Sequence, residues 1–174
     1  MKGLFVLNPP RPRYKAIWDV KIVLDYLSSS ENVSKLDFKM LTLQLTMLLC
    51  LVTAQRSQTL HLLKLSNMIS EGIIFIISDL VKQSSVRITA PIIKLRPYAD
   101  KALCVSPALQ EYLSRTKDLR KQVDNLFISY ERLHLAVTRN TISLWIKSML
   151  EIAGIDISIY KSHSTRAAAS TAMK

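Results

Sequence analysis

The stretch HSTRAAAS, at residues 163–170, is the one around which we expect the fold to be organised. His163 and Arg166 are three residues apart, so both side chains would project from one turn of a helix that begins near Ser164 or Thr165. Free backbone N–H groups point outward at a helix N-terminus, where anions bind. The alanines that follow would let neighbouring elements approach this helix closely. The stretch therefore predicts a phosphate-binding helix start, although H-x-x-R alone often occurs by chance.

The overall charge of the chain points to a class of partner. Of the 174 residues, 49% are hydrophobic, which is enough for one domain with a sizeable core. The chain has 24 lysines and arginines against 13 aspartates and glutamates, which gives a net charge of +11. This excess is spread along the sequence, as is typical of proteins that bind polyanions. It would also suit a basic soluble protein without such a partner, so charge alone leaves both interpretations open.

The positions of the cysteines and the lengths of the hydrophobic runs exclude further classes of protein. Cys50 and Cys104 are far apart and have no histidine pair nearby, so neither a zinc module nor a disulfide framework is indicated. Reduced, intracellular conditions fit this pattern. The run over residues 40–54 is shorter than a bilayer span and contains threonines and a glutamine, so it predicts a buried core helix. We expect no metal, no cofactor and no membrane partner.

The hydrophobic pattern predicts a mainly helical chain with one pair of strands. Residues 1–17 would form an extended basic arm and residues 18–174 a single domain. Helices are expected over residues 18–27, 34–54, 106–116 and 138–153, with another helical segment opening at 55–60. Strands are expected over residues 73–77 and 86–90, paired with each other.

Helix starts are indicated by capping residues. Ser34 followed by Asp37 resembles a capping box. Ser106 before Pro107 resembles an N-cap with proline at the first helical position. Thr138 is a third expected N-cap.

Four residues then stand out as cations or proton carriers. Arg56 is expected at a helix junction beside the core, and Lys82 between the two strands; His163 and Arg166 follow. Two guanidinium groups could clamp the non-bridging oxygens of a phosphodiester as negative charge develops on them. The lysine could deliver a proton to a departing sugar oxygen, and the histidine could accept a proton from an incoming hydroxyl or donate one to the phosphate.

These residues and their surroundings resemble the catalytic domain of tyrosine recombinases, the integrase-type enzymes that break and rejoin DNA through a phosphotyrosine link. The segments most similar to recombinases of eukaryotic mobile elements are AQRSQTL (54–60), RNTISLWIK (139–147), AGID (153–156) and HSTRAA (163–168). The resemblance extends from about Trp18 to Lys174. It implies an α+β, mainly α-helical fold, the DNA breaking-rejoining catalytic fold, with a small antiparallel β-sheet.

The resemblance also implies a role for each candidate residue. Arg56 and Arg166 would hold the scissile phosphate, Lys82 would act as general acid on the leaving 5′-oxygen, and His163 would assist the nucleophile. The implied partner is double-stranded DNA, with a possible homo-oligomer assembled on it. DNA recombination or integration in the nucleus is the implied process, with no small-molecule substrate.

Two departures from the family pattern affect the expected activity. Thr59 stands where the family usually has an acidic residue, three positions after Arg56. The nucleophilic tyrosine, expected some tens of residues beyond H-x-x-R, is missing because the sequence ends at Lys174, and Tyr160 precedes the motif. We therefore expect a C-terminally incomplete domain that binds phosphate without cleaving DNA. Whether it is a fragment of an active enzyme or a degenerate copy stays open.

Other functions remain open at this point. The chain could be a non-catalytic DNA-binding or regulatory module, or a helical protein-interaction domain whose charge only keeps it soluble. Lys82 could be an ordinary hairpin lysine, with Arg87 and Lys94 as competitors for its role. For His61 and His134 we predict ordinary packing or surface roles.

Overall fold

The computed structural model describes residues 17–69, 73–77, 92–162 and 164–172. The helical elements are α2 (Val20–Ser29), α3 (Phe38–Thr53), α4 (Ser57–His61), the 3-10 turn η1 (Leu65–Asn67), α5 (Val105–Thr116), α6 (Arg139–Ile152) and α7 (Ser164–Ala172). The strands are β1 (Met68–Ile69), β2 (Ile74–Ile76) and β3 (Ile92–Lys94). The predicted fold class, mainly helical with a small antiparallel sheet, is confirmed. All but the last residue of the predicted basic arm lies outside the described residues.

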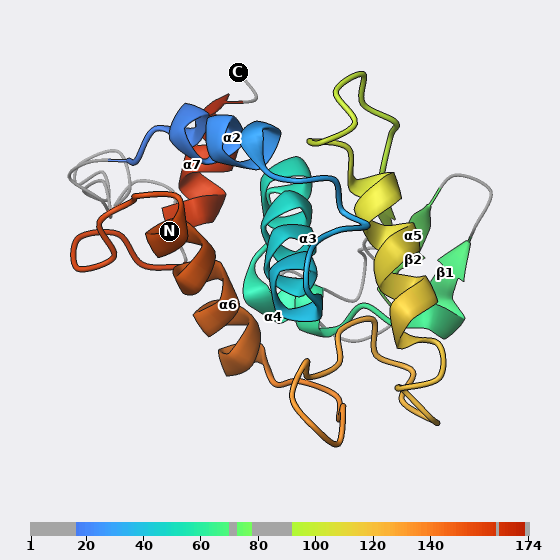
Figure 1. Cartoon of the computed structure of the whole chain (residues 1–174). Coiled ribbons are helices and arrows are strands. Elements are labelled where there is room, and N and C mark those ends of the chain that lie inside the picture. The colour runs from blue at the N-terminus through green and yellow to red at the C-terminus, as the bar shows by residue number, and fades with distance from the viewer. Residues whose placement is uncertain (1–16, 70–72, 78–91, 163, 173–174) are drawn as a thin grey trace, which may run out of the picture.

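Helix α3 runs through the centre of the molecule, with α5, α6 and α7 packed around it (Figure 1). Every residue from 41 to 51 is buried, which makes α3 the core helix predicted for residues 40–54. The hydroxyls of Thr42 and Thr46 each donate to the carbonyl oxygen four residues earlier, at 2.7 Å, and so are satisfied inside the core. Among the described helices, none is long and apolar enough to cross a membrane.

The start of α3 differs from the prediction. Asp37 is the N-cap, and its carboxylate accepts the backbone N–H of Met40 at 2.6 Å. Ser34 belongs instead to a turn, where its backbone N–H donates to the side-chain oxygen of Asn32. The reason is a distant contact, because Arg115 of α5 donates to the carbonyl oxygen of Ser34 at 2.7 Å and holds this segment outside the helix.

The start of α5 also differs, whereas that of α6 is confirmed. Helix α5 begins at Val105 after the N-cap Cys104, which places Pro107 at the third helical position. Proline is tolerated there because the first N–H groups of a helix have no partner within it. Thr138 caps α6 as predicted, with its hydroxyl accepting the N–H of Thr141 at 3.2 Å.

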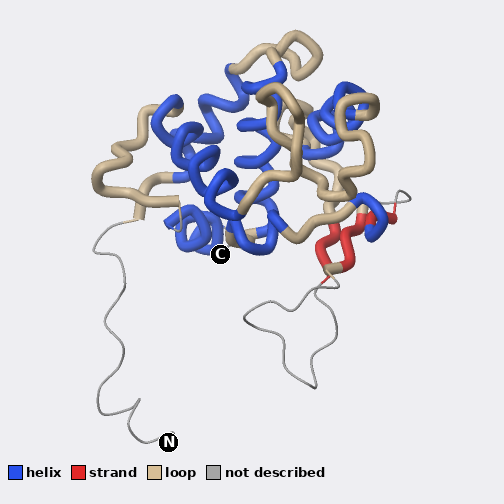
Figure 2. Tube along the Cα trace, turned by 90° about the horizontal axis from the view of Figure 1, so that it is seen from below, coloured by secondary structure: helices blue, strands red, loops and turns tan. Residues whose placement is uncertain are grey.

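Among the described residues, the sheet has three antiparallel strands in the order β1-β2-β3, at one edge of the helical body (Figure 2). In the central strand Phe75 pairs with Met68 on one side and Ile93 on the other. The predicted strand over residues 73–77 is confirmed by β2. The predicted partner strand over 86–90 lies outside the described residues, and the described partner of β2 is β3, which the sequence pattern does not predict.

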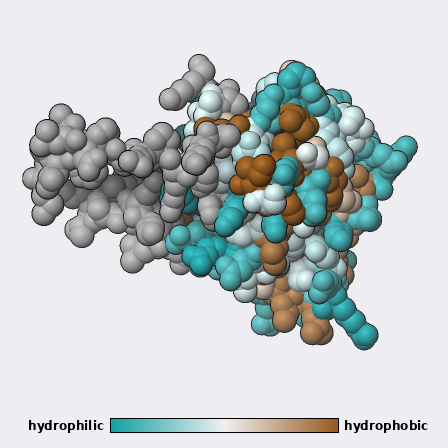
Figure 3. All heavy atoms as spheres, turned by 90° about the vertical axis from the view of Figure 1, so that its left-hand side faces the viewer, coloured by the Kyte–Doolittle hydropathy of each residue, from teal (hydrophilic) through white to brown (hydrophobic). Residues whose placement is uncertain are grey.

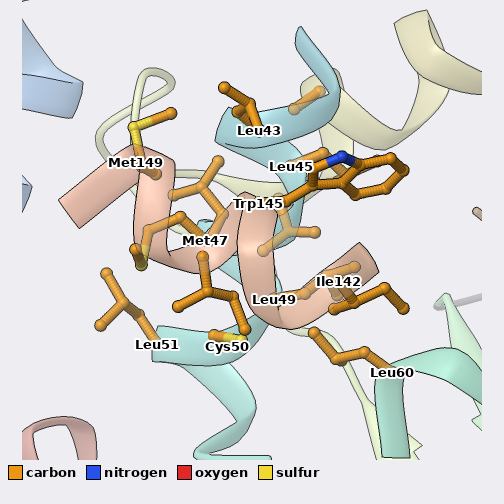
Figure 4. Close-up of a cluster of buried hydrophobic side chains, with 14 of the residues drawn as sticks. Leu43, Leu45, Met47, Leu49, Cys50, Leu51, Leu60, Ile142, Trp145 and Met149 are labelled. Carbon is orange, nitrogen blue, oxygen red and sulfur yellow. The ribbon is translucent and has the colours of Figure 1, made fainter. Parts of the chain in front are cut away.

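The contact between α3 and α6 fixes where the second half of the chain sits. Ile142, Trp145 and Met149 lie on one face of α6 and point into the side chains of α3, with Leu60 of α4 beside them (Figure 4). The rings of Trp145 and Phe127 meet edge to face with their centroids 6.0 Å apart. Because α6 also packs on α4, the start of α6 lies next to the junction between α3 and α4.

Candidate phosphate-binding site

Arg56 lies at the junction between α3 and α4, as predicted. Helix α3 is followed by Ala54 in the left-handed conformation, with φ of 48°, and this residue turns the chain. Arg56 is then the N-cap of α4, and its carbonyl oxygen accepts the N–H groups of Thr59 and Leu60 at 2.9 and 3.2 Å. The backbone of this residue is therefore fixed, while its side chain is exposed.

Arg166 is positioned by the packing of α7. Helix α7 begins at Ser164, whose hydroxyl accepts a hydrogen bond from the indole nitrogen of Trp18 at 3.1 Å, inside the core. Ala168 and Ala169 are buried, and α7 packs on α3, so the small residues allow the close approach that the sequence predicts. The third residue of this anchored helix is Arg166, which is half-buried.

Arg56 and Arg166 line the same hollow, together with a third arginine, Arg139. We call this feature the arginine hollow; its volume is about 380 Å³. Arg56 comes from the start of α4, Arg139 from the start of α6 and Arg166 from the first turn of α7. The other lining residues are polar: Gln55, Ser57, Gln58, Asn140, Ser143 and Ser162. The described lining contains no aspartate or glutamate.

The three guanidinium groups of the arginine hollow are not used to hold the scaffold together. Within the part of the chain that the structure describes, none of the three side chains makes a hydrogen bond or ion pair. Arg115 and Arg120 differ from them, because both donate to backbone carbonyl oxygens, those of Ser34 and Asn125 among them. The cations of the hollow are therefore free to bind an external anion.

Electrostatics favour an anion in this hollow. Arg139 is the first residue of α6 and Arg166 the third of α7, and neither helix has an acidic residue in its first turn. A cation near a helix N-terminus is opposed by the helix dipole by about 0.3–1 kcal/mol. Three like charges around one hollow also repel one another. A bound phosphate would relieve both costs while accepting paired hydrogen bonds from the guanidinium groups.

Two of the predicted site residues, Lys82 and His163, lie outside the described residues. The two other histidines have structural contacts, as predicted. The Nδ1 atom of His61 lies 3.0 Å from the carbonyl oxygen of Val137. The Nδ1 atom of His134 lies 2.9 Å from the carbonyl oxygen of Ser129.

The described residues offer no metal site and no tyrosine at the arginine hollow. No group of three or more His, Cys, Asp or Glu side chains among them could hold a metal ion. Cys50 and Cys104 are both buried and free. Tyr112 is fully buried, its hydroxyl oxygen accepts the N–H of Ile128 at 3.0 Å, and burial raises its pKa to about 12. No described tyrosine lines the arginine hollow.

Arg139 is the residue that sequence reasoning missed. It stands directly after the Thr138 cap, in a segment that the sequence distinguishes only by its family resemblance. A signal was nevertheless present, because a cation at the first helical position conflicts with the helix dipole. Such local conflicts are typical of functional positions.

Comparison with known proteins adds the identity of the fold. No protein-family model and no curated protein matches the sequence. Among solved structures, XerA recombinase matches 95% of this chain and 52% of its own, with a TM-score of 0.62 and 22% identity. XerH site-specific recombinase bound to difH substrate matches 92% and 43%, with a TM-score of 0.63 and 18% identity. A lambda integrase dimer bound to a COC′ core site matches 93% and 53%, with a TM-score of 0.55 and 18% identity.

These similarities show that the chain has the fold of the catalytic domain of tyrosine recombinases. The chain spans about half the length of the recombinase chains that it matches.

Proposed function

We propose that this chain binds the phosphate backbone of double-stranded DNA as a tyrosine-recombinase-type domain of site-specific recombination or integration. The observation that carries the proposal is that Arg56, Arg139 and Arg166 line one hollow. Among the described residues, no acidic side chain lines this hollow. Guanidinium groups match a phosphate because their N–H donors form parallel pairs with two of its oxygens. The fold, shared with recombinases in complex with DNA, supports the same partner.

The proposed chemistry follows from where charge develops in phosphodiester substitution. Arg56 and Arg166 would donate to the non-bridging oxygens and stabilise the negative charge that grows on them. Lys82 would protonate the leaving 5′-oxygen, and His163 would assist the attacking hydroxyl. The roles of Lys82 and His163 are supported by the sequence resemblance, and those of the arginines also by their shared hollow.

For residues 1–174 by themselves we propose binding without cleavage. Covalent catalysis needs a nucleophile. In the family that the sequence resembles, this is a tyrosine beyond H-x-x-R, whereas all six tyrosines of the sequence precede Arg166. A tyrosine donated by another segment or another chain would turn the same site into a cleaving one. Incubating the 174-residue chain with a nicked duplex tests this directly. We expect no covalent protein–DNA adduct, and an adduct formed by this chain alone would contradict the proposal.

The proposal extends to assembly and location. A homo-oligomer on DNA is supported by the lambda integrase neighbour, which is a dimer on its core site. A nuclear protein of a mobile element is supported by the resemblance of the quoted segments to eukaryotic mobile-element recombinases. Sedimentation of the chain with and without a duplex tests assembly, with dimers or larger species expected only when DNA is present.

Duplex binding across a salt series tests the function as a whole. Each phosphate neutralised by a lysine or arginine contributes about −0.9 to the slope of log affinity against log salt. We expect a steep negative slope for this chain. Binding that is absent or insensitive to salt would favour the alternative of a helical protein-interaction domain, whose net charge of +11 serves only solubility.

A further inference from the structure

A second hollow of about 390 Å³ adjoins the arginine hollow. Three residues, Asn140, Ser143 and Ser162, line both hollows, so the two hollows lie next to each other. Beyond these shared residues the second hollow is lined by Leu144, Lys147, Ile157 and Lys161. We call the second hollow and the shared residues together the α6 groove.

One wall of the α6 groove is a single face of α6. Asn140, Ser143, Leu144 and Lys147 stand at positions i, i+3, i+4 and i+7, which places them on one face of the helix. The opposite face of α6 is buried against α3, so the wall is backed by the core. Seven residues of helix rise about 10 Å, and a duplex strand advances about 3.4 Å per phosphate. The wall is therefore longer than the axial advance from one phosphate of a strand to the next.

The other wall is a folded turn between α6 and α7. The backbone N–H of Ile155 donates to the carbonyl oxygen of Leu150 at 2.9 Å, which holds the turn against the end of α6. The carboxylate of Asp156 accepts the N–H and the hydroxyl of Ser158 at 2.8 and 2.6 Å, and these bonds lower the pKa of that carboxyl. The N–H of Tyr160 donates to the carbonyl oxygen of Asp156 at 3.0 Å. Both walls are thus held by structure outside the groove.

The lining chemistry suits one kind of ligand. Lys147 and Lys161 are exposed cations that make no ion pair among the described residues, and the described lining holds no acidic side chain. Asn140 and Ser162 supply neutral donors, whereas the hydroxyl of Ser143 already donates to that of Ser57. Leu144 is apolar and yet 62% exposed. Figure 3 views the side of the molecule that carries α6, where exposed hydrophobic side chains lie among hydrophilic and near-neutral ones. Cations, neutral donors and apolar patches are together the complement of a sugar–phosphate backbone.

We infer that the α6 groove carries the sugar–phosphate backbone of the strand adjoining the phosphate in the arginine hollow. Lys147 and Lys161 each neutralise one further phosphate, and Leu144 lies against a deoxyribose. This inference rests on the proposed function and adds the path that the strand takes away from the arginines. Because these contacts go to the backbone, they position the duplex and carry no sequence preference.

A salt series with matched lysine variants tests the inference. The double variant K147Q/K161Q removes two charges from the α6 groove. The control K101Q/K117Q removes two charges from exposed lysines that line neither hollow. Duplex affinity is measured between about 50 and 200 mM salt, the range in which phosphate contacts dominate, and thermal melting verifies that both variants are folded.

Loss of two phosphate contacts should make the salt slope shallower by about 1.8 in K147Q/K161Q. The slope of K101Q/K117Q should stay that of the unmodified chain. Equal slopes in the two double variants would overturn the inference that the α6 groove carries the strand. The proposed function would stand, since the unmodified chain would still bind. Absence of salt-dependent binding by the unmodified chain would overturn the proposed function and the groove with it.

Discussion

The side-chain hydroxyls of Ser57 and Ser143 are joined by a hydrogen bond of 2.9 Å between their oxygen atoms. Ser57 is the first residue of α4 and directly follows Arg56, while Ser143 lies four residues after Arg139 on α6. The bond therefore ties together the two helix starts that carry two of the three arginines. Both serines line the arginine hollow, so the bond lies within the surface that it organises.

Replacing Ser143 by alanine should loosen this tie. We expect Ser143→Ala to lower the free energy of unfolding by about 1 kcal/mol, the net value of one hydrogen bond. The affinity for duplex DNA should fall by up to about fivefold, because the two arginines are no longer held in register. Urea denaturation and a binding titration measure the two effects. Ser114→Ala, at an exposed position of α5, is the control and should change neither. Reduced stability with unchanged affinity would show that the bond serves the fold alone.

The N-cap of α3 gives a test of the fold. Asp37→Ala removes the carboxylate that accepts the N–H of Met40, and we expect it to cost about 1 kcal/mol of stability. Ser34→Ala removes only a turn hydroxyl and should lie within about 0.5 kcal/mol of the unmodified chain. Chemical denaturation of the two variants, measured side by side, shows which of the two residues caps α3. A larger loss for Ser34→Ala would restore the capping box that the sequence suggests.

Two buried acids make stability fall at alkaline pH. Burial raises the pKa of the Cys50 thiol from 9.0 to about 12, and that of Tyr112 from 10.0 to about 12. The unfolded chain therefore loses these protons at lower pH than the folded chain does. Stability depends on the difference in bound protons, so this contribution is complete below pH 9 and is lost as the pH rises towards 12.

Urea denaturation between pH 8 and pH 11 measures this decline. In Cys50→Ala the thiol no longer contributes, so the decline should begin about one pH unit later, where Tyr112 starts to ionise in the unfolded chain. The alanine variant is expected to be less stable at every pH because it leaves a small cavity, so the shapes of the two curves are compared. Curves of identical shape would show that the thiol does not contribute.

Local patterns in the sequence predicted the elements that carry the arginine hollow. Long-range contacts determined the start of α3 and the strand that pairs with β2. The apolar run of α3 predicted its burial, and Thr138 predicted the start of α6. The sequence pattern predicted a cap at Ser34, whereas the cap is Asp37 and Ser34 is held by Arg115, which comes from a helix some eighty residues away. The strand that pairs with β2 is β3, which is too short for a period-2 hydrophobic pattern to be recognised in the sequence.

The site was predictable residue by residue but not as a shape. Arg56 and Arg166 each stood in a recognisable segment, yet nothing local states that they face one hollow. That convergence follows from the packing of α4, α6 and α7 around α3. Arg139, Lys147 and Lys161 line the two hollows because α6 and the turn after it share a surface, which no local sequence pattern predicts.

The most direct test of the central claim is a double-mutant cycle on Arg56 and Arg166, measured as affinity for duplex DNA at fixed salt. Each of Arg56→Gln and Arg166→Gln should lower the affinity by about tenfold or more, as expected for charge-assisted hydrogen bonds of about 1.5–3 kcal/mol. Arg132→Gln, an exposed arginine that does not line the arginine hollow, is the matched control and should have little effect.

Because both arginines are proposed to hold one phosphate, the double variant should lose less than the sum of the single losses, by at least about 0.5 kcal/mol. Losses no greater than that of Arg132→Gln, or losses of Arg56→Gln and Arg166→Gln that simply add, would contradict a shared phosphate clamp.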